Sequence, residues 1–187
     1  MRISSLIILS AFTIMGIYLI YHGMILRKKG FSALGKPTLH PVIFYIGKIA
    51  LFTSWFFLLV NSIMVITGEP SEQILYPIPA AIVMSVGSVF MIFAFRDLGD
   101  SLRVGLPAEA TNLKTNGIYH ISRNPIYVGV DLIAIASVVF IPGMINAGCA
   151  VVGIAVHHAI ILSEERFLEG RFGEDWRTYK RKTRRYF

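Results

Sequence analysis

The sequence of 187 residues has little charge and almost no cysteine. Only 16% of its residues are Asp, Glu, Lys or Arg, whereas soluble domains usually carry about 25%. The single cysteine, Cys149, excludes an intrachain disulfide and leaves no cysteine cluster for a metal ion. We therefore expect neither an ordinary soluble domain nor a metal site, and we expect no nucleic-acid partner.

Long apolar runs take the place of charge. Hydrophobic residues make up 55% of the chain, and the mean hydropathy is +0.63. A run of about 20 apolar residues is long enough to cross a bilayer as a helix. The sequence predicts an all-α integral membrane protein, with residues 1–187 as one domain. Its five transmembrane helices are expected at about residues 4–26, 41–67, 74–95, 125–141 and 147–163.

The basic residues are unevenly distributed among the connecting segments. All but Arg2 and Lys48 of the 18 Lys and Arg residues lie after the first expected span, after the third, or in the C-terminal tail. Cytoplasmic segments carry the excess of Lys and Arg in membrane proteins. This bias predicts a cytoplasmic tail and a cytoplasmic loop at 96–124, with the N-terminus outside.

The C-terminal tail has a helical apolar pattern. Its large apolar residues recur at steps of four, four and three, at Leu168, Phe172, Trp176 and Tyr179. This spacing predicts an amphipathic helix lying at the membrane interface. Gly170 and Gly173 are expected to allow that helix to bend.

The stretch 117–129 marks an abrupt change from a polar loop to an apolar run. Asn124 is a favourable N-cap residue and Pro125 suits the first helical position, so we expect a helix to begin at Pro125. The first turn of a helix offers free N–H groups and a positive dipole end, here beside Arg123. An anionic group such as a carboxylate can bind there, although the pattern also fits a helix start without a ligand.

Ionisable residues interrupt three of the expected spans. Lys48, Asp131 and His157 each lie six or seven residues from the cytoplasmic end of a span, a depth of about 9–11 Å. Charges inside spans are usually functional. The layer indicates either a ligand cavity or a buried structural network. The pair Glu164-Glu165 is either part of that site or interfacial charge.

Three short motifs follow one another in order. They are Gly117-x-Tyr119, then Arg123-Asn124-Pro125-x-Tyr127-x-Gly129, then Glu164-Glu165 followed by Phe172-Gly173 and Tyr179. Over about residues 98–179 the chain resembles the membrane methyltransferases that include isoprenylcysteine carboxyl methyltransferases and phospholipid methyltransferases.

The resemblance implies a methyl transfer from S-adenosylmethionine to a lipid-like or prenylated acceptor that enters from the bilayer among the membrane lipids. It also implies a cytoplasmic cofactor region at 98–129 and 157–179. The residues expected at the cofactor are Leu113, Lys114, Gly117, Tyr119, Arg123, Asn124, Pro125, Ile126, Tyr127, Glu164 and Glu165. Arg123 and a glutamate would bind the charged groups of the donor, and a tyrosine would lie against its adenine or sulfonium.

Two positions depart from the family pattern. Asn124 stands where a histidine is commonest. His158 and Leu162 stand where the eukaryotic prenylcysteine enzymes resemble one another in an Arg and a Glu. A histidine about 10 Å deep is expected to be neutral, so His158 is the candidate base for an amine or thiol acceptor. Prenylcysteine is therefore expected to be a poor substrate.

Two other classes share features with this chain. Membrane sterol reductases are similar in this region and use a nicotinamide cofactor, but they are usually larger. A non-catalytic membrane adaptor could use the same fold. Equilibrium binding of S-adenosylhomocysteine against NADPH distinguishes the three.

Overall fold

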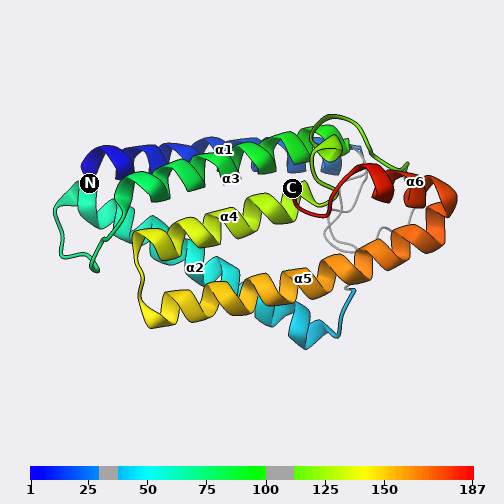
Figure 1. The fold of residues 1–187 in the computed structure, drawn as a ribbon. Coiled ribbons are helices and arrows are strands. Elements are labelled where there is room, and N and C mark those ends of the chain that lie inside the picture. The colour runs from blue at the N-terminus through cyan, green and yellow to red at the C-terminus, as the bar shows by residue number, and fades with distance from the viewer. Residues whose placement is uncertain (30–37, 100–111) are drawn as a thin grey trace.

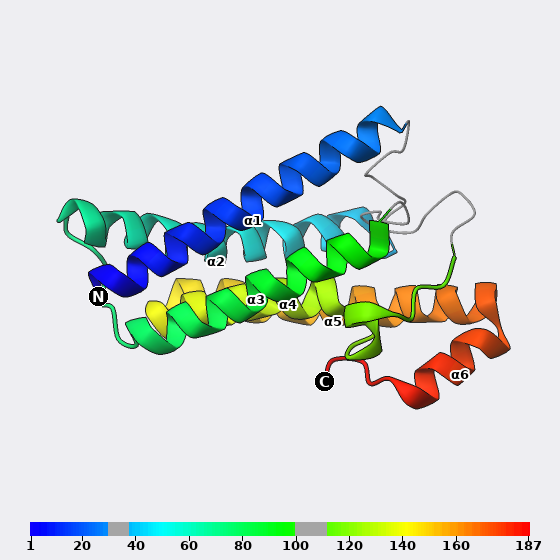
Figure 2. The same cartoon turned by 90° about the horizontal axis from the view of Figure 1, so that it is seen from above.

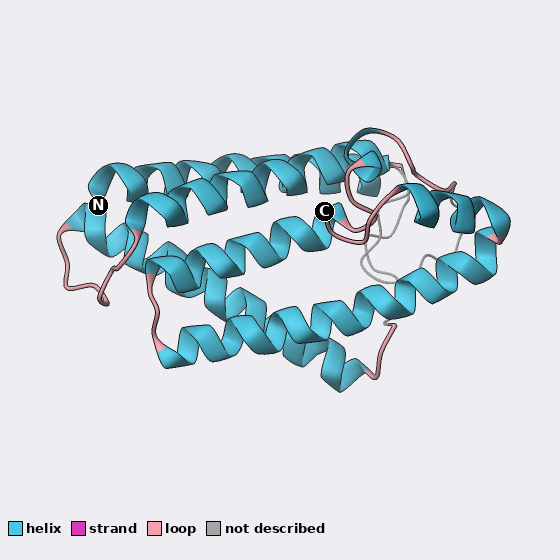
Figure 3. Ribbon diagram, viewed as in Figure 1, coloured by secondary structure: helices cyan, strands magenta, loops and turns pink. Residues whose placement is uncertain are grey.

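The computed structural model describes residues 1–29, 38–99 and 112–187. The loop charges Lys36 and Arg103 lie outside the described residues. Within the described ranges the chain forms only helices and their connections, as Figure 3 shows. The elements are α1 (Arg2–Lys28), α2 (Pro41–Thr67), α3 (Pro77–Leu98), the 3-10 turn η2 (Gly117–His120), α4 (Pro125–Phe140), α5 (Met144–Phe172) and α6 (Glu174–Lys182). The all-α prediction is confirmed for the described residues.

The number of spanning helices is smaller than predicted by the length criterion. Of the described helices, α1, α2, α3 and α5 are long and apolar enough to cross a membrane. The apolar helix α4 has 16 residues, about 24 Å at 1.5 Å per residue, which is shorter than the hydrocarbon core of about 30 Å. Pro142-Gly143 ends the apolar run early, because the chain turns there into α5. Two boundaries also differ, since α3 begins at Pro77 and α5 continues to Phe172.

The helices lie side by side in one elongated bundle (Figures 1 and 2). The packing of α3 against α4 depends on two glycines. A Cβ on Gly87 would lie 2.9 Å from the carbonyl oxygen of Gly129, and a Cβ on Gly129 would lie 2.7 Å from that of Gly87. Small residues allow helix backbones to approach closely in membranes. Gly129, the last residue of the second motif, therefore serves helix packing.

Polar side chains join α2, α4 and α5 at the end of the bundle away from the site. Ser54 donates a hydrogen bond to Asn146 at 2.8 Å, and Ser137 donates to the carbonyl of Ser54 at 2.6 Å. Asn146 in turn donates to the carbonyl of Ile141 at 2.8 Å. These three polar side chains are buried and satisfied, so they tie the helices together at little desolvation cost.

The C-terminal segment folds back over the bundle (Figure 1). Helix α5 continues without a break past Gly170, and the chain reverses at Gly173, where φ is +52°. Helix α6 then lies against the second half of α5 (Figure 2). Trp176 is 1% exposed and Tyr179 is 7% exposed. The amphipathic helix is present, with its apolar residues Trp176 and Tyr179 packed on the protein itself; its place at the membrane interface stays a prediction.

Candidate functional site

The candidate site lies where η2, the start of α4, the second half of α5, and α6 with the residues after it come together. Figure 1 shows the chain after α6 returning to the first turn of α4. The backbone N–H of Arg123 donates to the carbonyl of Arg184 at 3.0 Å, which joins these two segments directly. The segment before α4 and the segment after α6 therefore belong to one polar cluster.

A carboxylate at the end of α3 holds the turn that carries Tyr119. The Asp97 carboxylate accepts a hydrogen bond from the backbone N–H of Ile118 at 2.9 Å and one from Arg96 at 2.8 Å. Gly117 has a φ of +62°, and a Cβ there would lie 2.0 Å from an Asp97 oxygen. Only glycine fits this position without displacing the carboxylate. Gly117 is therefore required by the backbone of the turn.

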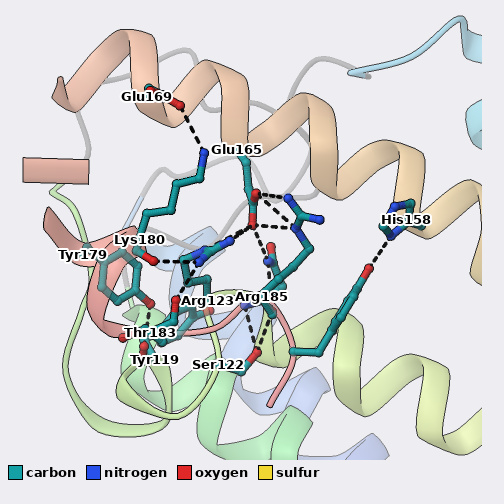
Figure 4. Close-up of polar contacts among 12 residues, drawn as sticks. Tyr119, Ser122, Arg123, His158, Glu165, Glu169, Tyr179, Lys180, Thr183 and Arg185 are labelled. Carbon is teal, nitrogen blue, oxygen red and sulfur yellow. Dashed lines mark hydrogen bonds and ion pairs between the residues drawn. The ribbon is translucent and has the colours of Figure 1, made fainter. Parts of the chain in front are cut away.

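Tyr119 and Tyr179 form a buried pair of aromatic side chains at the site. The hydroxyl of Tyr179 donates a hydrogen bond to the carbonyl of Tyr119 (Figure 4). Burial raises the pKa of both phenols far above the ordinary value, so both side chains stay neutral. Trp176 packs edge-on against Tyr179, with their ring centroids 5.6 Å apart.

Arg123 and Glu165 form a buried ion pair at the centre of the cluster (Figure 4). The guanidinium nitrogens Nε and Nη2 of Arg123 donate to Oε1 of Glu165 at 3.2 and 3.0 Å. Nη1 donates to the carbonyls of Lys180 at 3.2 Å and Thr183 at 2.6 Å. All three nitrogens of Arg123 are thus used to hold the C-terminal segment, so this guanidinium does not face an open site.

Two further residues donate hydrogen bonds to the Glu165 carboxylate and fill its remaining acceptor positions. Arg185 donates to both oxygens of Glu165, with an Nη2–Oε2 distance of 2.9 Å. This hydrogen bond to Glu165 raises the pKa of the Arg185 guanidinium further. Asn124 donates to Oε1 at 3.1 Å. We call the four residues Arg123, Asn124, Glu165 and Arg185 the tail clasp, because they tie the C-terminal segment to α4 and α5.

The role expected for Asn124 differs in one respect. Helix α4 begins at Pro125, as predicted, with Asn124 in the N-cap position. The Asn124 side chain makes no capping hydrogen bond, because its amide turns to Glu165 and to the carbonyl of Arg185. Its own N–H is satisfied by the hydroxyl of Ser122 at 3.1 Å. The capping interpretation of the Asn124 side chain is therefore wrong.

Glu164 occupies a different environment from its neighbour. Its carboxylate accepts a hydrogen bond from the Tyr127 hydroxyl at 2.8 Å. Among the described residues, no other donor reaches the Glu164 carboxylate. Glu164 and Tyr127 remain partly exposed, whereas Glu165 is 4% exposed. Of the two adjacent carboxylates, Glu164 is the one with capacity for a cationic ligand.

The ionisable residues of the three helices do meet in one layer. His157 binds Asp131 through Nδ1 at 2.9 Å and Lys48 through Nε2 at 3.1 Å. The His157 ring is fully buried, and it packs edge-on against Tyr127 with the centroids 5.0 Å apart. The predicted single layer is confirmed, and Tyr127 connects it to Glu164.

His158 does not lie where the sequence suggested. Its side chain is exposed and binds the hydroxyl of Tyr186 through Nδ1. His157, one residue earlier, is the buried histidine. Adjacent residues on a helix point about 100° apart, so depth along α5 did not decide which histidine faces inward. The expectation that His158 is buried is wrong.

The remaining predicted residues lie before η2 and in the first turn of α4. Leu113 and Lys114 are half-buried in the extended segment before η2. Pro125 and Ile126 form the first turn of α4, with Ile126 packed against the cluster of Ala94, Ile118 and Tyr119. The first turn leaves the N–H of Ile126 without an intrahelical acceptor.

Sequence reasoning missed Asp97, Ser122, Arg185 and Tyr186. The charges of the tail are indistinguishable from surface charges in a basic sequence. Ser122 donates to the carbonyl of Arg185 at 3.0 Å, a contact between residues 63 positions apart. No local pattern signals such a contact, although Gly173 marks the reversal that makes it possible.

Comparison with known proteins supports the interpretation of these motifs. Searches of the curated proteins and of the solved structures give no match. A scan against protein families matches residues 75–175 to the family described as phospholipid methyltransferase, a range that contains Gly117, Tyr119, the Arg123–Gly129 motif and both glutamates. Because the match covers more than half of the chain, the protein belongs to the phospholipid methyltransferase family of integral membrane methyltransferases.

Proposed function

We propose that this protein transfers a methyl group from S-adenosylmethionine to a lipid-like or prenylated acceptor embedded in the membrane. The observation that carries the proposal is that the two adjacent glutamates, Glu164 and Glu165, have different hydrogen-bond partners and different exposure. Glu165 is saturated by the other three residues of the tail clasp, whereas Glu164 is partly exposed and accepts only the Tyr127 hydroxyl among the described donors. A partly exposed carboxylate bonded to an aromatic side chain, inside a matched methyltransferase region, suits a cationic donor.

The chemistry of the described residues fits this donor. When bound, S-adenosylmethionine supplies an electrophilic methyl group on a sulfonium centre. Glu164 would bind its ammonium group, and the ring of Tyr127 would lie against a cationic part. The free amides in the first turn of α4, at Ile126 and Tyr127, would bind its carboxylate. By the family resemblance, Leu113, Lys114 and Tyr119 would contact its adenosine.

The tail clasp shapes this site without direct ligand contact. Arg123 and Asn124 hold Glu165 and the C-terminal segment in place. They thereby fix the first turn of α4 relative to α5, and alignment of this kind is the main contribution a protein makes to a direct displacement. Arg123, first considered a carboxylate ligand, is thus proposed as a positioning residue. His158 is proposed to anchor Tyr186.

Ligand binding to the detergent-solubilised chain tests the proposal. Calorimetry should detect S-adenosylhomocysteine binding and no NADPH binding. Glu164→Gln should weaken S-adenosylhomocysteine about ten- to hundredfold, because one charge-assisted hydrogen bond is lost. The matched control is Glu169→Gln on the same helix, whose carboxylate is 36% exposed and pairs with Arg177. NADPH binding would favour the reductase class, and binding of neither ligand would favour an adaptor.

A further inference from the structure

A hydrogen-bonded chain of three ionisable side chains lies next to the proposed donor site and contains none of the residues proposed above to bind the donor. Lys48 comes from α2, Asp131 from α4 and His157 from α5. The Lys48 Nζ–His157 Nε2 distance is 3.1 Å, and the His157 Nδ1–Asp131 Oδ1 distance is 2.9 Å. Three helices thus contribute one group each to a continuous chain.

The order of donors in this chain follows from the chemistry of its ends. An ionised carboxylate only accepts hydrogen bonds, so Asp131 accepts the Nδ1–H of His157. The Nε2 atom of His157 then carries a lone pair and accepts a hydrogen bond from Lys48. His157 is fully buried, so this tautomer is held by both neighbours. The free end of the chain is the Lys48 amine.

The Lys48 amine faces the same ring as the proposed donor site. It lies 5.6 Å from the ring centroid of Tyr127 and 5.4 Å from that of Phe44. The hydroxyl of the same Tyr127 is bonded to Glu164. Lys48 is only partly buried. One aromatic ring therefore separates the free amine from the carboxylate proposed to bind the donor.

The charged and titratable groups around Lys48 come from two helices. Helix α4 contributes Asp131 and Tyr127, and α5 contributes His157 and Glu164. No hydrogen bond or ion pair joins Lys48 to the described helix α1. Each of these neighbours accepts a hydrogen bond, carries negative charge or offers a ring face, so together they would stabilise the ammonium that forms when a neutral Lys48 amine takes up a proton.

We propose that Lys48, positioned by His157 and Asp131, receives the proton that the methyl acceptor releases. This inference rests on the proposed function and deepens it. An acceptor X–H forms the X–C bond with its lone pair, and the electron pair of the broken C–S bond stays on sulfur. The proton from X passes to the lone pair of a neutral Lys48 amine, which becomes an ammonium hydrogen-bonded to His157. The acceptor is then a protic group, since an ionised carboxylate has no proton to release.

The geometry favours Lys48 over the histidine that the sequence suggested. His158 is exposed and bound to Tyr186, whereas the Lys48 amine faces the ring of Tyr127 inside the bundle. A lysine held among helices can serve as a base because its amine can lose its proton there. An arginine at the same position could bind anions but could not accept a proton.

Chemical labelling tests the state of Lys48 without any acceptor. The purified chain is treated with an amine-directed acylating reagent at pH 8, and modification is followed by mass spectrometry. Only the neutral amine reacts, so Lys48 should be acylated at least as fast as the exposed Lys182 of α6, which serves as internal control. Slower acylation of Lys48 than of Lys182, or none, would overturn the proposal.

Methylation assays test the role of the same amine. The probes are vesicles of phosphatidylethanolamine and a prenylated cysteine analogue, each with labelled S-adenosylmethionine. Lys48→Met and Lys48→Arg should both lower methylation of the amine probe by about 10²–10⁴-fold, the usual effect of a lost general base. Asp131→Asn should alter the pH profile of methylation, and Lys182→Met should leave the rate unchanged.

Binding separates the failure of this inference from failure of the proposed function. The Lys48 variants should bind S-adenosylhomocysteine within about threefold of the unaltered chain. Full activity of Lys48→Arg would mean that the residue acts as a fixed cation, which defeats this inference alone. Loss of S-adenosylhomocysteine binding in Lys48→Met would also defeat it, because the residue would then serve donor binding. Absence of binding by the unaltered chain would defeat the proposed function itself.

Discussion

The guanidinium of Arg123 lies 3.0 Å from the carboxylate of Glu165, across 42 positions of sequence, with both side chains less than 10% exposed. Breaking a buried pair by removing one charge leaves the other uncompensated, at a cost of about 3–5 kcal/mol. Because Arg123 also holds the carbonyls of Lys180 and Thr183, this pair connects the stability of the C-terminal segment to that of the site.

Arg123→Gln should therefore lower the free energy of unfolding by about 3–5 kcal/mol. The measurement is denaturant unfolding in detergent, followed by the fluorescence of Trp176, whose ring lies 5.9 Å from the Arg123 guanidinium. Arg177→Gln is the matched control, since its pair with Glu169 is 57% and 36% exposed and should be worth at most about 1 kcal/mol. Equal effects of the two substitutions would contradict the burial argument.

Gly117→Ala should disrupt the turn that carries Tyr119. A positive φ costs a residue with a Cβ about 1–2 kcal/mol, and the new Cβ would overlap the Asp97 carboxylate. We expect lower thermal stability and weaker S-adenosylhomocysteine binding. Gly143→Ala is the control, because nothing lies within 4 Å of a Cβ there. A melting temperature equal to that of the unaltered chain would show that the turn tolerates a side chain.

Tyr179 should make the chain sensitive to alkaline pH. Burial raises the pKa of its phenol above the ordinary value, while an unfolded tyrosine titrates near pH 10. The native state thus retains a proton that the unfolded state loses. Stability is unaffected below about pH 10 and falls as the pH rises above it. Tyr119 contributes in the same direction.

Unfolding measured from pH 8 to pH 11.5 tests this effect. Tyr179→Phe should reduce the loss of stability above about pH 10. At neutral pH the same variant should be less stable by about 1–3 kcal/mol, because the buried carbonyl of Tyr119 loses its donor. Tyr21→Phe, at a residue that is 58% exposed, should change neither quantity. An unchanged alkaline profile in Tyr179→Phe would refute the assignment.

Charge distribution makes a prediction about orientation. A reporter fused after Phe187 should read as cytoplasmic, and the same reporter inserted in the connector at 69–73 should read as external. The basis is the concentration of Lys and Arg in the tail and in the segments after α1 and α3. The reverse pattern would place the proposed donor site on the wrong side for a cytosolic donor.

Much of the bundle could be predicted from local sequence. Hydropathy alone located the long helices, because a spanning helix must satisfy its backbone internally and keep its surface apolar. Pro125 after Asn124 located the start of α4, since proline suits only the first helical turn. The depth of Lys48, Asp131 and His157 followed from counting residues along each helix.

Orientation within the site was decided by tertiary structure. Glu164 and Glu165 are adjacent on α5, and the helical repeat shows only that their side chains point in different directions. Glu165 is the saturated one because the chain reverses at Gly173 and brings Arg185 back to it. The same reversal brings Tyr186 to the exposed His158, while the packing of α5 against α2 and α4 encloses His157. Local sequence determines where a helix begins and how apolar it is, but the partner of a polar side chain depends on residues far away in the chain, which only the packed structure brings within reach.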